Sequence, residues 1–142
     1  MPELTTLTDP EAELLVLGSV LIDDAYLSTV REVLAPEHFS NAEYRTVYRA
    51  MLALADRSIP VEAITVFWEM QAIGGDEMKK PSILAHAASL ALTPCHARFY
   101  ADRVRDMAER RRMFTEAQTM AGKALDKSKP VNRRATKGGV PV

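Results

Sequence analysis

The residue types that could bind a phosphate group are glycines followed by a lysine, and one segment brings them together. A phosphate-binding loop needs the pattern G-x-x-x-x-G-K-[ST], whose backbone amides and lysine surround the phosphates. In GGDEMKKP, residues 74–81, Lys79 stands where the second glycine should be, and Pro81 stands where the hydroxyl should be. Gly18, in VLGSVLID, has no lysine after it. We therefore expect this chain to have no cofactor, neither ATP nor Mg²⁺.

Metal ligands and nucleophiles are similarly sparse. The three histidines are far apart in the sequence: His38, His86 and His96. Cys95 has no second cysteine with which to form a pair at zinc-binding spacing. Asp23 and Asp24 are adjacent, and aspartates at such a position most often cap a helix. Since no nucleophile stands out together with its base, we expect a chain that is not an enzyme by itself and has no catalytic or metal site.

Charge is distributed unevenly, although the net charge is only −1. Residues 1–97 hold 6 basic against 14 acidic residues, and residues 98–142 hold 12 against 5. The basic candidates for a nucleic-acid surface are Arg110, Arg112, Lys127, Lys129, Arg133, Arg134 and Lys137. A solvated helix face followed by a linker explains the same pattern, because charge runs alone name no partner. Both interpretations stay open.

The composition is that of an ordinary soluble globular domain. Of 142 residues, 47% are hydrophobic and 26% are charged. The polar, acidic N-terminus is unlike a secretory signal, and no stretch approaches the 18 consecutive apolar residues of a membrane span. Cys95 is the single cysteine, which fits a reducing compartment. We expect a cytoplasmic protein without membrane contact.

Helix signals indicate the elements that would position any site. Asp9 and Pro10 mark the start of a first helix, whose apolar residues have helical spacing around Gly18. SNAE, residues 40–43, fits a capping box with Ser40 as the cap of a later helix. Gly18 then lies inside a core helix, where it allows a neighbour to approach closely. No segment alternates like a strand, so we predict an all-α fold with a compact globule of about five helices in residues 1–94.

One long helix is predicted to follow the globule, over residues 95–126, before a basic disordered tail at 127–142. About 30 residues of helix span about 45 Å, which is longer than a compact domain of this size. A 4-3 spacing links Tyr100, Val104, Met107, Arg111, Phe114, Gln118, Ala121 and Leu125. That spacing is typical of a coiled-coil-like seam, although the same face could lie on the domain's own core.

Four segments in order resemble the N-terminal domain of DnaB-type replicative DNA helicases. They are EAELLVLGSVLID, LAPEHF, EYRTVYRAMLALADRSIPVEAITV and HARFYADRVRDMAERR, and the similarity covers about residues 9–125. In that family the domain is a helical globule followed by a helical hairpin, and the hairpins pair protomers into a collar on a hexameric ring. The resemblance makes the long helix the first hairpin helix. It also makes Tyr100, Val104, Met107, Arg111, Phe114 and Ala121 the candidate pairing face.

The resemblance implies a noncatalytic assembly domain in DNA replication. The collar of this family docks primase and, in some systems, a helicase loader, whereas ATP and Mg²⁺ belong to a RecA-like domain that this sequence does not contain. The expected partners are therefore helicase protomers, primase and, in some systems, a loader, with weak or indirect DNA contact and an oligomer in the full-length context. Where the second hairpin helix should begin, the sequence reads KSKPVNRRATKGGVPV. The alternative is a small stand-alone protein that binds nucleic acid or modulates a helicase through the basic C-terminal helix and tail.

Overall fold

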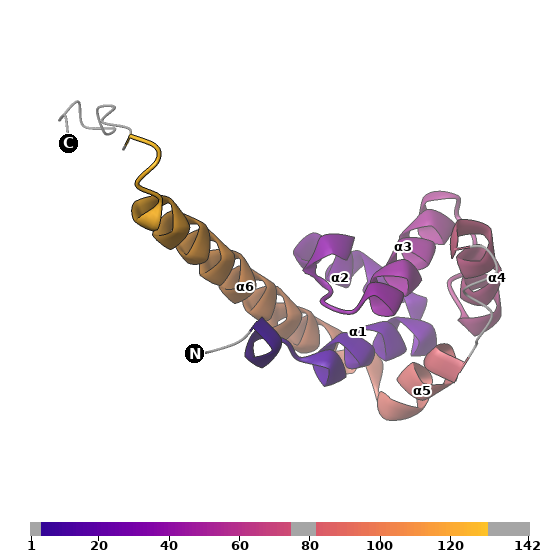
Figure 1. Cartoon of the computed structure of the whole chain (residues 1–142). Coiled ribbons are helices and arrows are strands. Elements are labelled where there is room, and N and C mark those ends of the chain that lie inside the picture. The colour runs from indigo at the N-terminus through magenta and orange to yellow at the C-terminus, as the bar shows by residue number, and fades with distance from the viewer. Residues whose placement is uncertain (1–3, 75–81, 131–142) are drawn as a thin grey trace.

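The computed structural model describes residues 4–74 and 82–130, and these residues form helices joined by loops and turns. The α-helices are α1 (Pro10–Ile22), α2 (Leu27–Val33), α3 (Ala42–Asp56), α4 (Ala63–Gly74), α5 (Ser82–Leu90) and α6 (Ala97–Leu125). Short 3-10 helices precede several of them: η1 (Leu4–Leu7), η2 (Asp24–Tyr26), η3 (Pro36–His38) and η5 (Pro94–His96). The predicted all-α fold is confirmed. Figure 1 shows α1 to α5 gathered in a globule from which α6 projects.

The ends of the long helix differ slightly from the prediction. It begins at Ala97, two residues late, because Pro94 starts a 3-10 turn in which the Thr93 hydroxyl accepts from the Cys95 amide. It ends at Leu125, and residues 127–129 form a turn. The predicted disordered tail lies outside the described residues from 131 onward. The proposed boundaries of the three segments therefore stay predictions.

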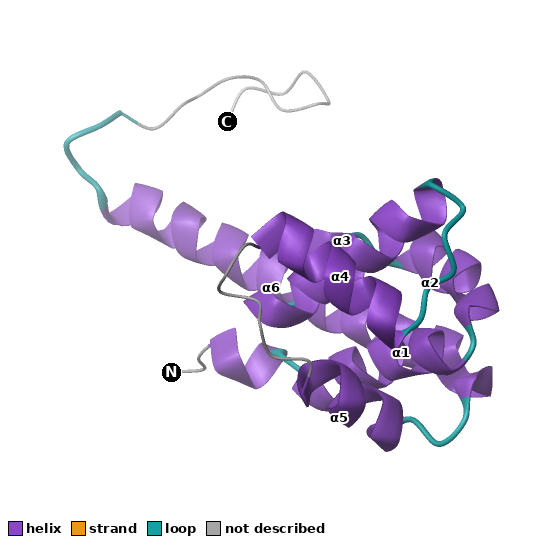
Figure 2. Ribbon diagram, turned by 90° about the vertical axis from the view of Figure 1, so that its right-hand side faces the viewer, coloured by secondary structure: helices purple, strands orange, loops and turns teal. Residues whose placement is uncertain are grey.

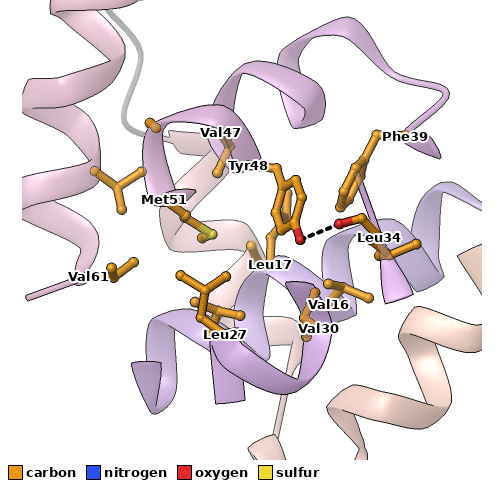
Figure 3. Close-up of a cluster of buried hydrophobic side chains, with 14 of the residues drawn as sticks. Val16, Leu17, Leu27, Val30, Leu34, Phe39, Val47, Tyr48, Met51 and Val61 are labelled. Atoms are coloured by element: carbon orange, nitrogen blue, oxygen red, sulfur yellow. Dashed lines mark hydrogen bonds between the residues drawn. The ribbon is translucent and has the colours of Figure 1, made fainter. Parts of the chain in front are cut away.

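Helix α1 is the central element of the globule. It packs against α5, α6 and α3, and its Val16, Leu17 and Val20 side chains are completely buried. Around it, α2 packs on α6. Helix α3 lies beside α4, as Figure 2 shows. The Tyr48 hydroxyl lies inside this core and donates to the Leu34 carbonyl at 2.8 Å (Figure 3). Burial raises the pKa of Tyr48 to about 12.

The start of α1 and the role of Gly18 agree with the prediction. Asp9 caps the helix by accepting a hydrogen bond from the Ala12 amide, and Pro10 occupies the first turn. At Gly18 the backbone of α5 comes so close that an added Cβ would lie 2.0 Å from the Ala87 carbonyl oxygen. Gly18 therefore permits the contact between α1 and α5.

The predicted cap of α3 is wrong by one residue. Asn41, not Ser40, caps the helix, because its side chain accepts from the amides of Glu43 and Tyr44 at 2.8 and 3.2 Å. Ser40 instead donates through both its amide and its hydroxyl to the buried carboxylate of Glu13. Because a buried charge needs hydrogen-bond donors, Ser40 serves as a donor to Glu13 and not as the cap of α3.

Candidate protein-interaction surface

Helix α6 has an anchored half and a free half. The anchored half buries Ala97, Ala101 and Val104 in the globule's core. Beyond Phe114, which is half-buried, every residue from 115 to 130 is exposed. Since an α-helix rises about 1.5 Å per residue, the 11 exposed helical residues from 115 to 125 span about 16 Å. Figure 1 shows this end of α6 projecting away from the globule.

The predicted pairing face divides between these two halves. Val104 is buried in its own chain, and Tyr100, Met107, Arg111 and Phe114 are half-buried, whereas Ala121 is exposed. The alternative that this face lies on the domain's own core therefore holds for Val104, which is not accessible to a partner in this structure. Ala121 is exposed because α6 extends past the globule beyond Phe114, where residues on every side of the helix are exposed.

The free half carries a second apolar line that the sequence analysis missed. We call Met113, Ala117, Met120 and Ala124 the free face; the two methionine side chains are 62% and 72% exposed. At 100° per residue, Ala117 lies about 140° around the helix from Val104. This side of α6 is therefore turned away from the globule. In the sequence, the free face continues a 4-3 spacing that begins at Phe99. Charged residues at positions 103, 106 and 110 interrupt that line and hide the pattern.

The arginines predicted as a nucleic-acid surface are matched by carboxylates. Arg110 pairs with Asp106 at 2.9 Å, and Arg112 pairs with Glu109 and Glu116 at 3.0 and 2.8 Å. Hydrogen bonds from Arg112 and Arg105 lower the pKa of Glu109. Arg98, Arg103 and Arg105 have acidic partners as well. The exposed arginines of α6 that were predicted to bind nucleic acid are therefore engaged in ion pairs, and the nucleic-acid alternative is not favoured.

The remaining basic candidates lie in and beyond the turn that follows α6. Lys127 and Lys129 are exposed. Arg133, Arg134 and Lys137 lie outside the described residues. Among the residues that the structure describes, no group of three His, Cys, Asp or Glu side chains could hold a metal ion. Within the same residues, no helix is both long and apolar enough to cross a membrane.

Arg111 has a different role from its neighbours on α6. Its guanidinium donates to the Leu7 carbonyl at 2.8 Å and to the His38 carbonyl at 2.9 Å. It therefore links α6 to two parts of the globule, η1 and η3. Burial lowers the pKa of Arg111.

Comparison with known proteins gives consistent matches. The family profile described as DnaB-like helicase N terminal domain matches residues 5–106. The replicative DNA helicase DnaB of Geobacillus stearothermophilus is 36% identical over 112 residues, which cover 78% of this chain and 25% of that protein. This chain thus spans about a quarter of the length of that relative, and the same share of the replicative helicase DnaC of Bacillus subtilis.

Solved structures agree in fold. The N-terminal domain of DnaB helicase from Mycobacterium tuberculosis superposes with a TM-score of 0.82 at 27% identity, and the match covers 87% of this chain and 89% of that chain. The N-terminal domain of DnaB helicase from Helicobacter pylori, described together with its interactions with primase, superposes with a TM-score of 0.71 at 20% identity. That match covers 85% of this chain and 94% of the other.

Proposed function

Because this chain belongs to the family of DnaB-like helicase N-terminal domains, we propose that it assembles a replicative DNA helicase through the free face of α6. In this role the chain binds other helicase protomers and catalyses no reaction itself. The observation that carries the proposal is the free face, whose two methionines are mostly exposed although they lie on a well-formed helix.

The free face is suited to pairing with the same face of a second protomer. Fully burying a methionine side chain contributes about 1.5–3 kcal/mol to stability. In a symmetric pair each methionine contributes this amount twice, because both protomers supply one copy. Met113 and Met120 are separated by one heptad, with Ala117 between them. Large and small residues that alternate along a 4-3 line suit the knobs-into-holes packing of two helices.

The globule supplies a second proposed contact. The Helicobacter pylori domain is described with its interactions with primase, and we extend that partner to this chain. The globule is separate from the free face, since α1 and α2, the two globule helices that pack most closely on α6, lie against its Val104 side. A primase can therefore bind the globule while α6 is paired.

The pairing test compares two adjacent substitutions. Met120→Asp places a charge on the free face, and Thr119→Asp places the same charge about 100° around the helix, outside that face. Both residues are exposed in the single chain, so neither change should affect its folding, which circular dichroism verifies. Sedimentation equilibrium should show a dimer for the wild type and for Thr119→Asp. Losing two buried methionines, at least about 3 kcal/mol, weakens the Met120→Asp dimer by about 100-fold or more in Kd.

Two results would count against the pairing. A wild-type chain that stays monomeric at every concentration has no self-pairing face. Equal dissociation constants for the two variants would place the interface elsewhere. Primase binding is measured separately, by titrating the primase of the same replication system into the Met120→Asp chain. If no complex between primase and the Met120→Asp chain is detected, the proposed binding of primase to the globule is wrong.

A further inference from the structure

A buried carboxylate holds the loop from which α3 begins. Glu13, on α1, is 1% exposed. It accepts hydrogen bonds from the Ser40 amide at 3.0 Å, from the Ser40 hydroxyl at 2.6 Å and from the Asn41 amide at 3.3 Å. The carboxylate therefore fixes two successive amides of a segment that has no helical partners of its own.

Two arginines bind the carbonyl groups of the same loop. Arg45, on α3, donates to the Phe39 carbonyl at 3.0 Å, and Arg111, on α6, donates to the His38 carbonyl at 2.9 Å. Side chains from α1, α3 and α6 thus bind the backbone of residues 38–41. Glu13 also favours the charged form of Arg111, against the burial that lowers the pKa of this arginine.

Arg111 lies where α6 leaves the globule. Val104, two turns earlier, is buried, and Phe114, three residues later, is half-buried before the exposed half begins. One nitrogen of its guanidinium reaches η1 and the other reaches the loop that Glu13 holds. A planar guanidinium can hold two carbonyls in fixed directions, whereas a lysine ammonium is a point charge on a flexible stem.

We propose that Arg111 is a positioning residue that sets the angle between α6 and the globule by fastening the helix to two backbone carbonyls. Without these bonds, the half-buried Phe114 is the last side chain of α6 beyond Ala108 that still packs on the globule. Leu125 is 17 residues beyond Ala108, so a bend of about 10° there moves Leu125 by about 4 Å. The inference rests on the fold of a single chain and does not require pairing. If two chains do pair through α6, this angle sets how their globules are placed.

The test measures the distance between the globule and the free half of α6. Spin labels are placed at Arg49→Cys on α3 and Thr119→Cys on α6, both exposed positions, in a full chain that carries Cys95→Ser. Excess unlabelled protein keeps the measured distances within one chain. The distance distribution should be narrow with Arg111 present. In Arg111→Gln it should broaden or shift by several ångströms.

Arg112→Gln is the matched control, because the carboxylates that Arg112 binds, on Glu109 and Glu116, both lie on α6. It should leave the distance distribution unchanged. An unchanged distribution in Arg111→Gln, or equal broadening in Arg112→Gln, overturns the proposal. If Arg111→Gln unfolds, Arg111→Lys keeps the charge without the two-pronged contact, and an unchanged distribution in that variant overturns it equally. A monomeric wild type would refute the pairing and leave this test intact.

Discussion

Gly18→Ala provides a direct test of how closely α1 and α5 pack. The new Cβ would lie 2.0 Å from the Ala87 carbonyl oxygen and 2.9 Å from the Ala91 Cβ. Ordinary contact begins near 3.4 Å, and the nearest atom belongs to helix backbone, which no rotamer change can move. Helix α5 must therefore shift by about 1 Å or more, which disturbs the packing of Leu84 and Ala87, both almost fully buried.

The net change follows from two opposing contributions. Alanine is a better helix former than glycine by about 1 kcal/mol. Forcing extra volume into a packed interface costs about 1–3 kcal/mol, sometimes more, and the close approach to backbone places Gly18 at the upper end of that range. We expect Gly18→Ala to lower the free energy of unfolding by about 2 kcal/mol. For a domain of this size that corresponds to about 6 °C in Tm.

The assay is thermal and urea unfolding followed by circular dichroism, with Gly122→Ala as the matched control. Gly122 lies in the free half of α6, and nothing lies within 4 Å of a Cβ added there. This variant gains the helix preference of alanine without a clash, so its Tm should equal or slightly exceed that of the wild type, with slightly higher helix content. A Gly18→Ala protein as stable as the wild type would show that α5 adapts without cost, and the inferred role of Gly18 would then be wrong.

Two further predictions concern a helix end and a histidine. Ser58 follows the C-cap of α3, has a φ of 58°, and donates its amide to the Ala55 carbonyl. Because glycine adopts a positive φ without strain, Ser58→Gly should raise the free energy of unfolding by about 1 kcal/mol. Ser58→Ala should give no such increase, and urea unfolding measures both variants. Burial, together with Arg105, lowers the pKa of His38 from its usual 6.5, and its Nδ1 must stay unprotonated to accept from the Ala35 amide. Because the unfolded chain binds this proton at higher pH than the folded chain, stability should fall as pH decreases from about 7 to 5. His38→Asn should weaken this dependence of the free energy of unfolding on pH. An unchanged dependence in that variant would show that other groups cause it.

Local sequence signals predicted the features that depend on neighbouring residues. Asp9 before Pro10 marks the start of α1 correctly, because a cap and its amide partners lie within one turn. The same rule failed at Ser40, whose hydroxyl fits a capping box equally well. There the deciding partner is Glu13, 27 residues away. A buried carboxylate on another helix cannot be inferred from the spacing of SNAE.

The interaction surface was only partly predictable for a similar reason. The sequence of α6 contains two 4-3 lines, one through Val104 and one through Met113, and each line has polar interruptions. Which line the globule covers depends on where α1 and η1 lie, which is a tertiary property. The line through Val104 has more apolar residues and was the predicted pairing face, but the chain's own core covers part of it.

The angle between these two lines has a functional consequence. Val104 faces the core, while the free face lies about 140° around the helix. A partner on the free face therefore does not compete with the globule for the same side chains, so pairing requires no part of the core to open. What a partner does depend on is the direction of the free half, because α6 transmits any change at its anchored end to residues 115–125 as a rigid rod. The two carbonyl bonds of Arg111 lie between those two parts of the helix. Changes at Arg111 should therefore alter the geometry of an assembly before they alter its affinity.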